Sequence, residues 1–272
     1  MLKRIITAVL MIAVLLPVMY FSGGYIFEIA VAFLSVVAVY ELLECTQLTK
    51  EYAVCIPLFL YAVAMPLYVG ISYRYVYNLT VLVIFVIFSV SVFSKGKCSI
   101  EKLASLSAFV VYVVSSFTAL IILRRGEFGE YIIWLVIIGA CVTDTAAYFT
   151  GFVCGKHKLI PDVSPKKTVE GAVGGIVFCT AAYIIYGLWV EKTFPVKADI
   201  LFLGIAGFIV SIVSQLGDLV ASKIKRHYNI KDFGKIFPGH GGVLDRFDSI
   251  IAVAAFLLVI TSCSDVIPLF KL

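Results

Sequence analysis

The stretch ADILFLGIAGFIVSIVSQLGDLVAS, residues 198–222, decides the fold. A helix crosses the roughly 30 Å hydrocarbon core of a bilayer with about 20 apolar residues, and this stretch carries no charge between Asp199 and Asp218. We therefore expect a transmembrane helix. Asp218 lies within its last turns, and a carboxylate at membrane depth is costly and indicates a functional site with a partner. An ion pair with Lys225, further along the helix, is the structural alternative.

The rest of the chain shares this apolar character. Of its 272 residues, 62% are hydrophobic and 14% charged, and the mean hydropathy is +1.06, whereas soluble domains have about 45–50% apolar residues. The predicted fold is therefore all-α, a polytopic integral membrane protein with about nine transmembrane helices. The predicted spans are 4–22, 25–44, 53–73, 75–94, 103–123, 131–153, 169–190, 198–222 and 248–268.

The first span resembles a signal peptide, because two cations precede an apolar core. It lacks a small-x-small cleavage site and further spans follow it, so we expect it to be retained.

The cations divide unequally between the two faces that nine spans create. The face that holds the N-terminus has 16 of the 22 Lys and Arg residues, and the other face has six. The positive-inside rule then predicts a cytoplasmic N-terminus, and the same face carries loops 154–168 and 222–248. On this division, residues 1–130 form about five N-terminal spans and residues 131–272 form a catalytic region. We expect a multi-pass protein of the inner (cytoplasmic) membrane with its active site facing the cytoplasm.

The last cytoplasmic loop reads SKIKRHYNIKDFGKIFPGHGGVLDRFD, residues 222–248. Pro238 and the glycines at 239, 241 and 242 are poor helix formers, and glycine lets backbone N–H groups approach a phosphate closely. Because the loop leads into the N-terminus of the last span, its free amides and the helix dipole predict an anion site.

Two carboxylates follow this loop. Asp245 and Asp248 are three residues apart in the first turns of the last span, so they share one face. Carboxylates beside a phosphate would repel it unless a divalent cation lay between them, and hard oxygen ligands suit magnesium. Complementing the helix dipole is their simpler role. Arg246 points away from that face and is a candidate clamp for a phosphate or a lipid headgroup.

Other residues of this face have equally plain structural roles. Lys223, Lys225 and Arg226 could be cations that extend from a helix end to the membrane surface. His240 could be a general base, a phosphate donor or a turn residue. Glu41, with Glu44, closes the second span, and we expect a solvated helix end there.

The loop between the sixth and seventh spans carries a second group of polar residues. Asp144 lies within an apolar run, and Ser164 with Pro165 is a good cap and first-turn pair for a new helix. Lys166 and Lys167 would then stand at a helix start, which the dipole disfavours unless an anionic ligand is present. Attraction to anionic lipids is the alternative role of the two lysines.

The residues of the last loop resemble the signature of the phosphatidate cytidylyltransferases, or CDP-diacylglycerol synthases. The matching positions are Ser222, Ile224, Lys225, Arg226, Lys231, Asp232, Gly234, Phe237, Pro238, His240, Gly241, Gly242, Val243, Asp245, Arg246, Phe247 and Asp248. The upstream block is also similar, at Asp144, Ala147, Tyr148, Gly151, Gly155, Ser164, Pro165, Lys166, Lys167, Thr168, Glu170 and Gly171. Length and apolar character fit as well, although the first five spans add only general hydrophobicity.

This resemblance implies a magnesium-dependent transfer of the cytidylyl group of CTP to phosphatidate, giving CDP-diacylglycerol and pyrophosphate. It also implies a homodimer, and no nucleic-acid partner is expected. A transferase that uses CTP with a polyprenol or ether-lipid acceptor is the alternative, because apolar spans do not disclose the acyl pocket. A transporter fits poorly, because the polar groups lie toward one face and no repeat is visible.

We assign the roles as hypotheses. Magnesium is assigned to Asp218, Asp245 and Asp248, with Asp144 and Asp232 as second choices. The catalytic set consists of those first three aspartates with Lys225, Arg226 and His240. The substrate phosphates are assigned to Ser164, Lys166, Lys167, Thr168, Lys231, Arg246 and the amides of Gly241 and Gly242.

Overall fold

The computed structural model of the chain describes residues 13, 17–22, 24–69, 74–94, 98–263 and 269–271. At 74 and 75 only the backbone is described. In this part of the chain, seven helices are long and apolar enough to cross a membrane, which confirms an all-α, polytopic membrane protein. They correspond to the second to eighth predicted spans. The predicted span 4–22 lies mostly outside the described residues.

The chain divides into two compact units. The first unit takes Met1–Ile122 and His227–Arg246, and the second takes Leu123–Arg226 and Phe247–Leu272. In the first unit, α2 (Tyr25–Cys45) packs against α3 (Tyr52–Val69), and α3 packs against α4 (Arg74–Phe93). Helix α5 (Ile100–Arg125) follows α4 and runs on into the second unit.

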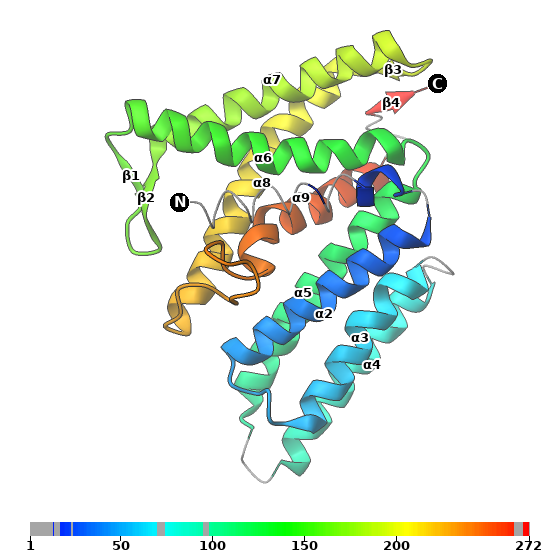
Figure 1. Ribbon diagram of the computed structural model, residues 1–272, viewed down its shortest axis with the longest axis vertical. Helices are drawn as coiled ribbons and strands as arrows, with labels where there is room; N and C mark the ends of the chain where they lie inside the picture. The colour runs from blue at the N-terminus through cyan, green and yellow to red at the C-terminus, as the bar shows by residue number, and fades with distance from the viewer. Residues whose placement is uncertain are drawn as a thin grey trace. The chain divides into compact units, whose positions relative to one another are not determined.

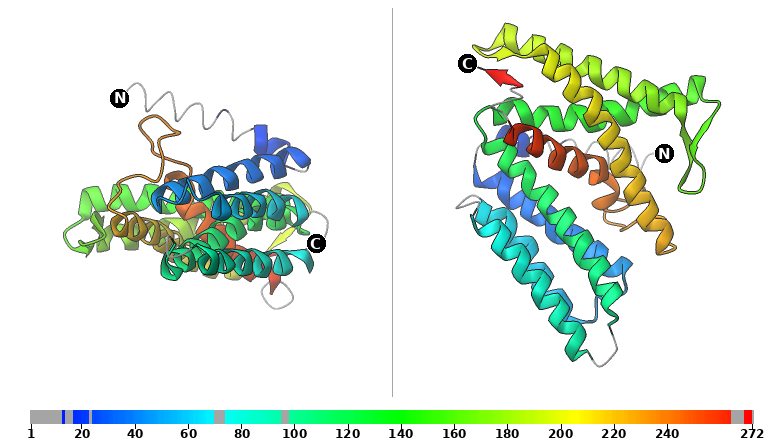
Figure 2. Two further views of the ribbon diagram at one scale, coloured as in Figure 1. Left: turned by 90° about the horizontal axis from the view of Figure 1, so that it is seen from below. Right: turned by 180° about the vertical axis from the view of Figure 1, so that it is seen from behind.

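The second unit is built on α6 (Gly129–Cys154) and α7 (Val169–Thr193), which lie side by side (Figures 1 and 2). Strands β1 (Lys158–Ile160) and β2 (Ser164–Thr168) form a hairpin at one end of this pair. At the other end, β3 (Lys197–Ala198) pairs with β4 (Phe270–Lys271), as Figure 2 also shows. The remaining helices are α8 (Ile200–His227) and α9 (Leu244–Ser262). The chain returns from the first unit to the second within α9, between Arg246 and Phe247.

Helix α9 covers most of the ninth predicted span but carries too many charged residues to be counted among the seven spanning helices. Asp245, Arg246 and Asp248 put three charges into its first turns. Its buried face is nevertheless apolar, with Ile251, Val253 and other residues almost inaccessible. A helix that carries charge at one end and apolar side chains along the rest is suited to hold polar groups at a membrane boundary.

Small residues set the packing of the second unit. A Cβ atom at Gly139 of α6 would lie 2.6 Å from Val210 of α8 and 3.3 Å from Val253 of α9. Small residues at such positions allow membrane helices to approach closely. The adjacent Tyr183 of α7 is buried, and its hydroxyl donates to the carbonyl of Leu135 at 2.6 Å. These contacts join α6, α7, α8 and α9 into one body.

The connection between α6 and α7 is a β-hairpin, so the expected helix start at Ser164 and Pro165 is wrong. Lys158 pairs with Thr168 and Ile160 with Ser164. Pro161 and Asp162 form the turn, which the Val163 N–H closes by donating to the Ile160 carbonyl at 3.2 Å. Pro165 is tolerated because a two-stranded ribbon has only edge strands.

Candidate active site

The aspartates of α8 and α9 meet because a glycine lets the two helices touch. A Cβ atom at Gly217 would lie 2.6 Å from the Ala252 side chain and 2.9 Å from the Asp248 carbonyl. The next residue along α8 is Asp218, whose carboxylate lies near enough to Asp248 to repel it. The two acids are therefore held by packed backbone.

Asp218 is paired with a cation from the hairpin. The Lys167 Nζ lies 2.7 Å from Asp218 Oδ2, and both side chains are largely buried, at 23% and 31% exposed. Lys167 also donates to the Gln215 carbonyl at 3.4 Å, and Ser222 donates to Asp218 Oδ1 at 3.4 Å. The structure thus places Lys167 from β2 on the Asp218 carboxylate.

Three carboxylates share this region of the second unit. The Asp248 side chain is partly buried and experiences repulsion from Asp218 and Asp144 together with attraction from Lys225. Packing three acids near one another in an apolar bundle is costly unless cations offset them. The lysines at 167 and 225 supply part of this compensation.

The donor chemistry of this group fits magnesium. All donors are carboxylate oxygens, and Mg²⁺ binds through one or two carboxylates while keeping waters and substrate phosphates as its other ligands. Among the described residues, no three His, Cys, Asp or Glu side chains already surround one point. An open site of one or two carboxylates is consistent with these donors and with the lack of a three-residue cluster among the described residues.

The glycine loop of the first unit is folded by two left-handed glycines. The His240 N–H donates to the Phe237 carbonyl at 2.8 Å across Pro238 and Gly239, and Gly239 has φ +80°. Proline followed by glycine with positive φ is the pattern of a type II turn. Gly241, at φ +85°, then carries the chain into α9, and its carbonyl accepts from the Phe237 N–H at 2.9 Å.

Two of the chain's own carboxyl groups occupy the anion site that this loop was predicted to offer a phosphate. Asp245 Oδ2 accepts from the N–H groups of Gly242 at 2.9 Å and Phe233 at 2.8 Å. Glu41 of α2 accepts at both oxygens, from Val243 at 2.7 Å and Leu244 at 2.9 Å. The Gly242 amide therefore donates to Asp245 in this structure, and its role toward a substrate phosphate stays a prediction.

The burial of Glu41 was not predicted from the sequence, where we expected a solvated helix end. Its side chain is only 1% exposed. A signal was present, because an acid in the last turns of a helix opposes the helix dipole and needs a compensating partner. The partner lies 202 residues further along the chain, too far for any local pattern to reveal.

The hairpin corrects the expected position of Lys166, Lys167 and Thr168 at a helix start, and their roles toward substrate phosphates stay predictions. Both lysines lie in β2 and precede the helix, so the dipole argument for an anion beside them does not apply. Thr168 is the N-cap of α7, and its Oγ1 accepts from the Gly171 N–H at 3.1 Å. Its hydroxyl therefore serves the helix start. Lys166 is exposed, whereas Lys167 is turned toward Asp218.

Glu170 fastens the base of the hairpin to the first turn of α7. Its carboxylate accepts from the backbone N–H groups of Lys156 at 3.1 Å and His157 at 3.2 Å, and it lies 2.7 Å from His157 Nδ1. The hairpin that carries Lys167 is thus held at its entry by Glu170 and at its exit by the Thr168 cap.

The other predicted residues are less engaged. Arg246 is exposed and its Nε donates to the His240 carbonyl at 2.8 Å, which braces the loop. The Nδ1 atom of His240 is buried without a hydrogen-bond partner in the described part of the chain. Side chains at three further predicted positions are exposed, namely Arg226, Lys231 and Asp232.

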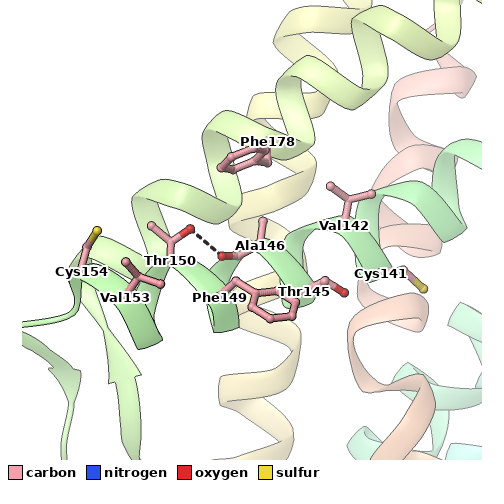
Figure 3. Close-up of a pocket in the computed structure, with 9 residues that line it drawn as sticks. All are labelled: Cys141, Val142, Thr145, Ala146, Phe149, Thr150, Val153, Cys154 and Phe178. Atoms are coloured by element: carbon pink, nitrogen blue, oxygen red, sulfur yellow. Dashed lines mark hydrogen bonds between the residues drawn. The ribbon is translucent and has the colours of Figure 1, made fainter.

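A cavity of about 650 Å³ lies along the outer face of α6 and α7 (Figure 3). Phe149, Val153 and Phe178 are among its walls, which are almost entirely apolar, and Asp144 is not among them. The Thr150 hydroxyl in its wall donates to the Ala146 carbonyl at 2.6 Å within α6 (Figure 3). This surface suits hydrocarbon and does not suit a charged nucleotide.

Comparison with known proteins identifies the family of the chain. The chain matches the model of the cytidylyltransferase family over residues 2–264. It is 35% identical over 263 residues to the phosphatidate cytidylyltransferase of Staphylococcus aureus (strain COL), covering 94% of this chain and 97% of that protein. It is also 33% identical over 263 residues to the phosphatidate cytidylyltransferase of Staphylococcus haemolyticus (strain JCSC1435), with the same coverage. A match of this extent shows that the chain belongs to the cytidylyltransferase family.

Proposed function

We propose that the chain transfers the cytidylyl group of CTP to phosphatidate, giving CDP-diacylglycerol and pyrophosphate. The observation that carries this proposal is the group formed by Asp218, Asp248 and Lys167 inside an otherwise apolar helical body. A lipid acceptor accounts for the membrane-spanning helices, and an anionic donor and acceptor account for the acids and cations. The names of the staphylococcal relatives support the same reaction.

The reaction joins two anions. An oxygen of the phosphatidate phosphate forms a bond to the α-phosphorus of CTP, and the bond from that phosphorus to the bridging oxygen of the β-phosphate breaks. Pyrophosphate leaves with the electron pair of that bond. The attacking phosphate is already largely ionised near neutral pH, so the chain needs no general base, and its task is to position the reactants and offset their charge.

Magnesium would be held by Asp218 and Asp248, with Asp144 beside them, while Asp245 and Asp232 stay predicted ligands. When bound, the ion supplies positive charge that neutralises the phosphates. Lys167 holds the Asp218 carboxylate from one side, and Lys225 offsets the negative charge at Asp248. The hairpin keeps Lys167 in place through its two attachments to α7.

The assay that tests this function uses purified protein in mixed micelles with phosphatidate, labelled CTP and Mg²⁺. We expect labelled CDP-lipid and an equal amount of pyrophosphate, because each transfer releases one pyrophosphate. Diacylglycerol, which has no phosphate, serves as the control lipid and should give no product. Labelled product with a polyprenol or ether-lipid acceptor and none with phosphatidate would contradict the proposed acceptor.

The site is proposed to face the cytoplasm across the cell membrane, with the N-terminus on the same side. Asp162 in the hairpin and Lys192 near the end of α7 lie at opposite ends of one spanning helix. With the exposed Cys141, Cys154 and Cys263 replaced by serine, an impermeant maleimide should label Lys192→Cys in intact cells. It should label Asp162→Cys only after permeabilisation, and the reverse pattern would overturn the orientation. The predicted homodimer rests on the family resemblance alone.

A further inference from the structure

The contact between α2 and the glycine loop brings together residues that no local pattern connects. Glu41 lies four residues before the end of α2, Val243 directly precedes α9, and Leu244 is the first residue of α9. Each carboxyl oxygen of Glu41 accepts one of their backbone N–H groups, at 2.7 and 2.9 Å. These N–H groups lie at the start of the helix, where backbone N–H groups have no acceptor within the helix itself. Glu41 therefore caps α9 from another helix.

The loop is also shaped around this side chain. A Cβ atom at Gly242 or at Gly234 would collide with Glu41 Oε1. A side chain at either position would displace the Glu41 carboxyl group from its present place. Neither position needs glycine for its own φ angle, since neither is among the left-handed residues. Two glycines of the signature sequence thus serve a contact with α2.

We propose that Glu41 is a positioning residue for cytidylyl transfer, which acts through the backbone of the glycine loop. It fixes the first turn of α9, the helix that carries Asp245 and, one turn later, Asp248. The side chain touches neither reactant and holds the start of the helix on which the reacting groups depend. The inference rests on the proposed function for its kinetic consequence and not for the contact itself.

Glu41→Gln is the direct test, because glutamine has nearly the same shape but offers one acceptor and one NH₂ group. That NH₂ group would face a backbone N–H, so one hydrogen bond is lost and a buried donor is left unpaired. We expect kcat to fall about tenfold or more in Glu41→Gln, and about a hundredfold in Glu41→Ala, where both acceptors are lost. Glu44→Gln, on an exposed side chain one turn further along α2, should leave kcat unchanged.

Hydrogen exchange separates positioning from a general loss of stability. In Glu41→Gln, peptides that cover residues 237–246 should exchange faster, while peptides from α6 and α7 keep their protection. Faster exchange throughout the chain, or normal exchange and normal kcat in Glu41→Gln, would overturn the proposal. If even the wild-type protein lacked transferase activity but the local exchange effect appeared, the proposed reaction would fail and the contact would stand.

A second variant approaches the same contact from the loop and protects the test against a folding defect in α2. Gly242→Ala places a methyl group against Glu41 Oε1 and should give the same local exchange and a similar loss of kcat. Because both substitutions disrupt one contact, the double variant Glu41→Gln/Gly242→Ala should be little worse than the poorer single variant. Losses that multiply fully would show that the two residues act independently and would count against the proposal.

Discussion

Asp248→Asn is expected to lower kcat for the transfer from CTP to phosphatidate by at least about 10³-fold, which is about 4 kcal/mol of transition-state stabilisation. The reason is electrostatic. Asparagine keeps the shape of the side chain and its bond to the Ser249 N–H, but it removes the negative charge that, with Asp218 and Asp144, would attract a divalent cation. The variant also relieves repulsion among these acids, so the protein should remain folded.

Two measurements check this expectation. Turnover is followed in mixed micelles, and the melting temperature is measured with and without Mg²⁺ and a non-hydrolysable CTP analogue. Ligands that bind the folded state raise the melting temperature, so the wild-type protein should show a shift that Asp248→Asn lacks. Asp162→Asn, on the exposed hairpin turn, is the matched control and should behave like the wild-type protein. Near-normal turnover in Asp248→Asn would exclude Asp248 as a metal ligand.

Lys167→Glu is expected to be nearly as damaging, with a loss of at least about 10²-fold in kcat/KM for CTP. The substitution turns a 2.7 Å ion pair with Asp218 into two carboxylates that face each other in a partly buried position. The charge at Asp218 is then uncompensated and a cation available to a triphosphate is lost. Both changes weaken the binding of CTP, so KM for CTP should rise while KM for phosphatidate changes less.

The neighbouring lysine supplies the comparison for this prediction. Lys166→Glu changes an exposed side chain next to Lys167 on the same strand, so it should raise KM for CTP by less than about tenfold through long-range charge alone. Lys158→Glu on the exposed face of β1 should have little effect. Equal losses in Lys166→Glu and Lys167→Glu would mean that the hairpin acts as a diffuse basic patch and that the ion pair with Asp218 has no special part.

The helices were predictable because hydrophobic length is a local property. The window 198–222 became α8 (Ile200–His227), and the window 131–153 became α6 (Gly129–Cys154), with ends displaced by a few residues. Asp144 and Asp218 also stood out on the sequence alone, because each is an acid within an apolar run, and the structure places both near enough to Asp248 to repel it. These predictions needed no knowledge of which helix packs against which.

The structure differs from the prediction where contacts other than those within a helix decide the local structure. Ser164 and Pro165 resemble a helix start locally, yet pairing of Ile160 with Ser164 and the cap at Thr168 move the start of α7 to Val169. The amides at the start of α9 resembled a phosphate cradle, yet Asp245 and Glu41 already accept from them. In the first case the pairing of the hairpin strands overrode the preference for a helix start. In the second case the chain's own carboxyl groups accept from amides that appear free on the sequence alone.

The link between Glu41 and Val243 has a consequence for biosynthesis. A ribosome adds about 5–20 residues per second, so the 202 residues between the two take about 10–40 s to produce. Throughout that interval the nascent chain carries an acid near the end of α2 whose eventual donors do not yet exist. The emerging protein must shelter this carboxyl group by other means, with water, a proton or the insertion machinery, until translation has reached the last helix.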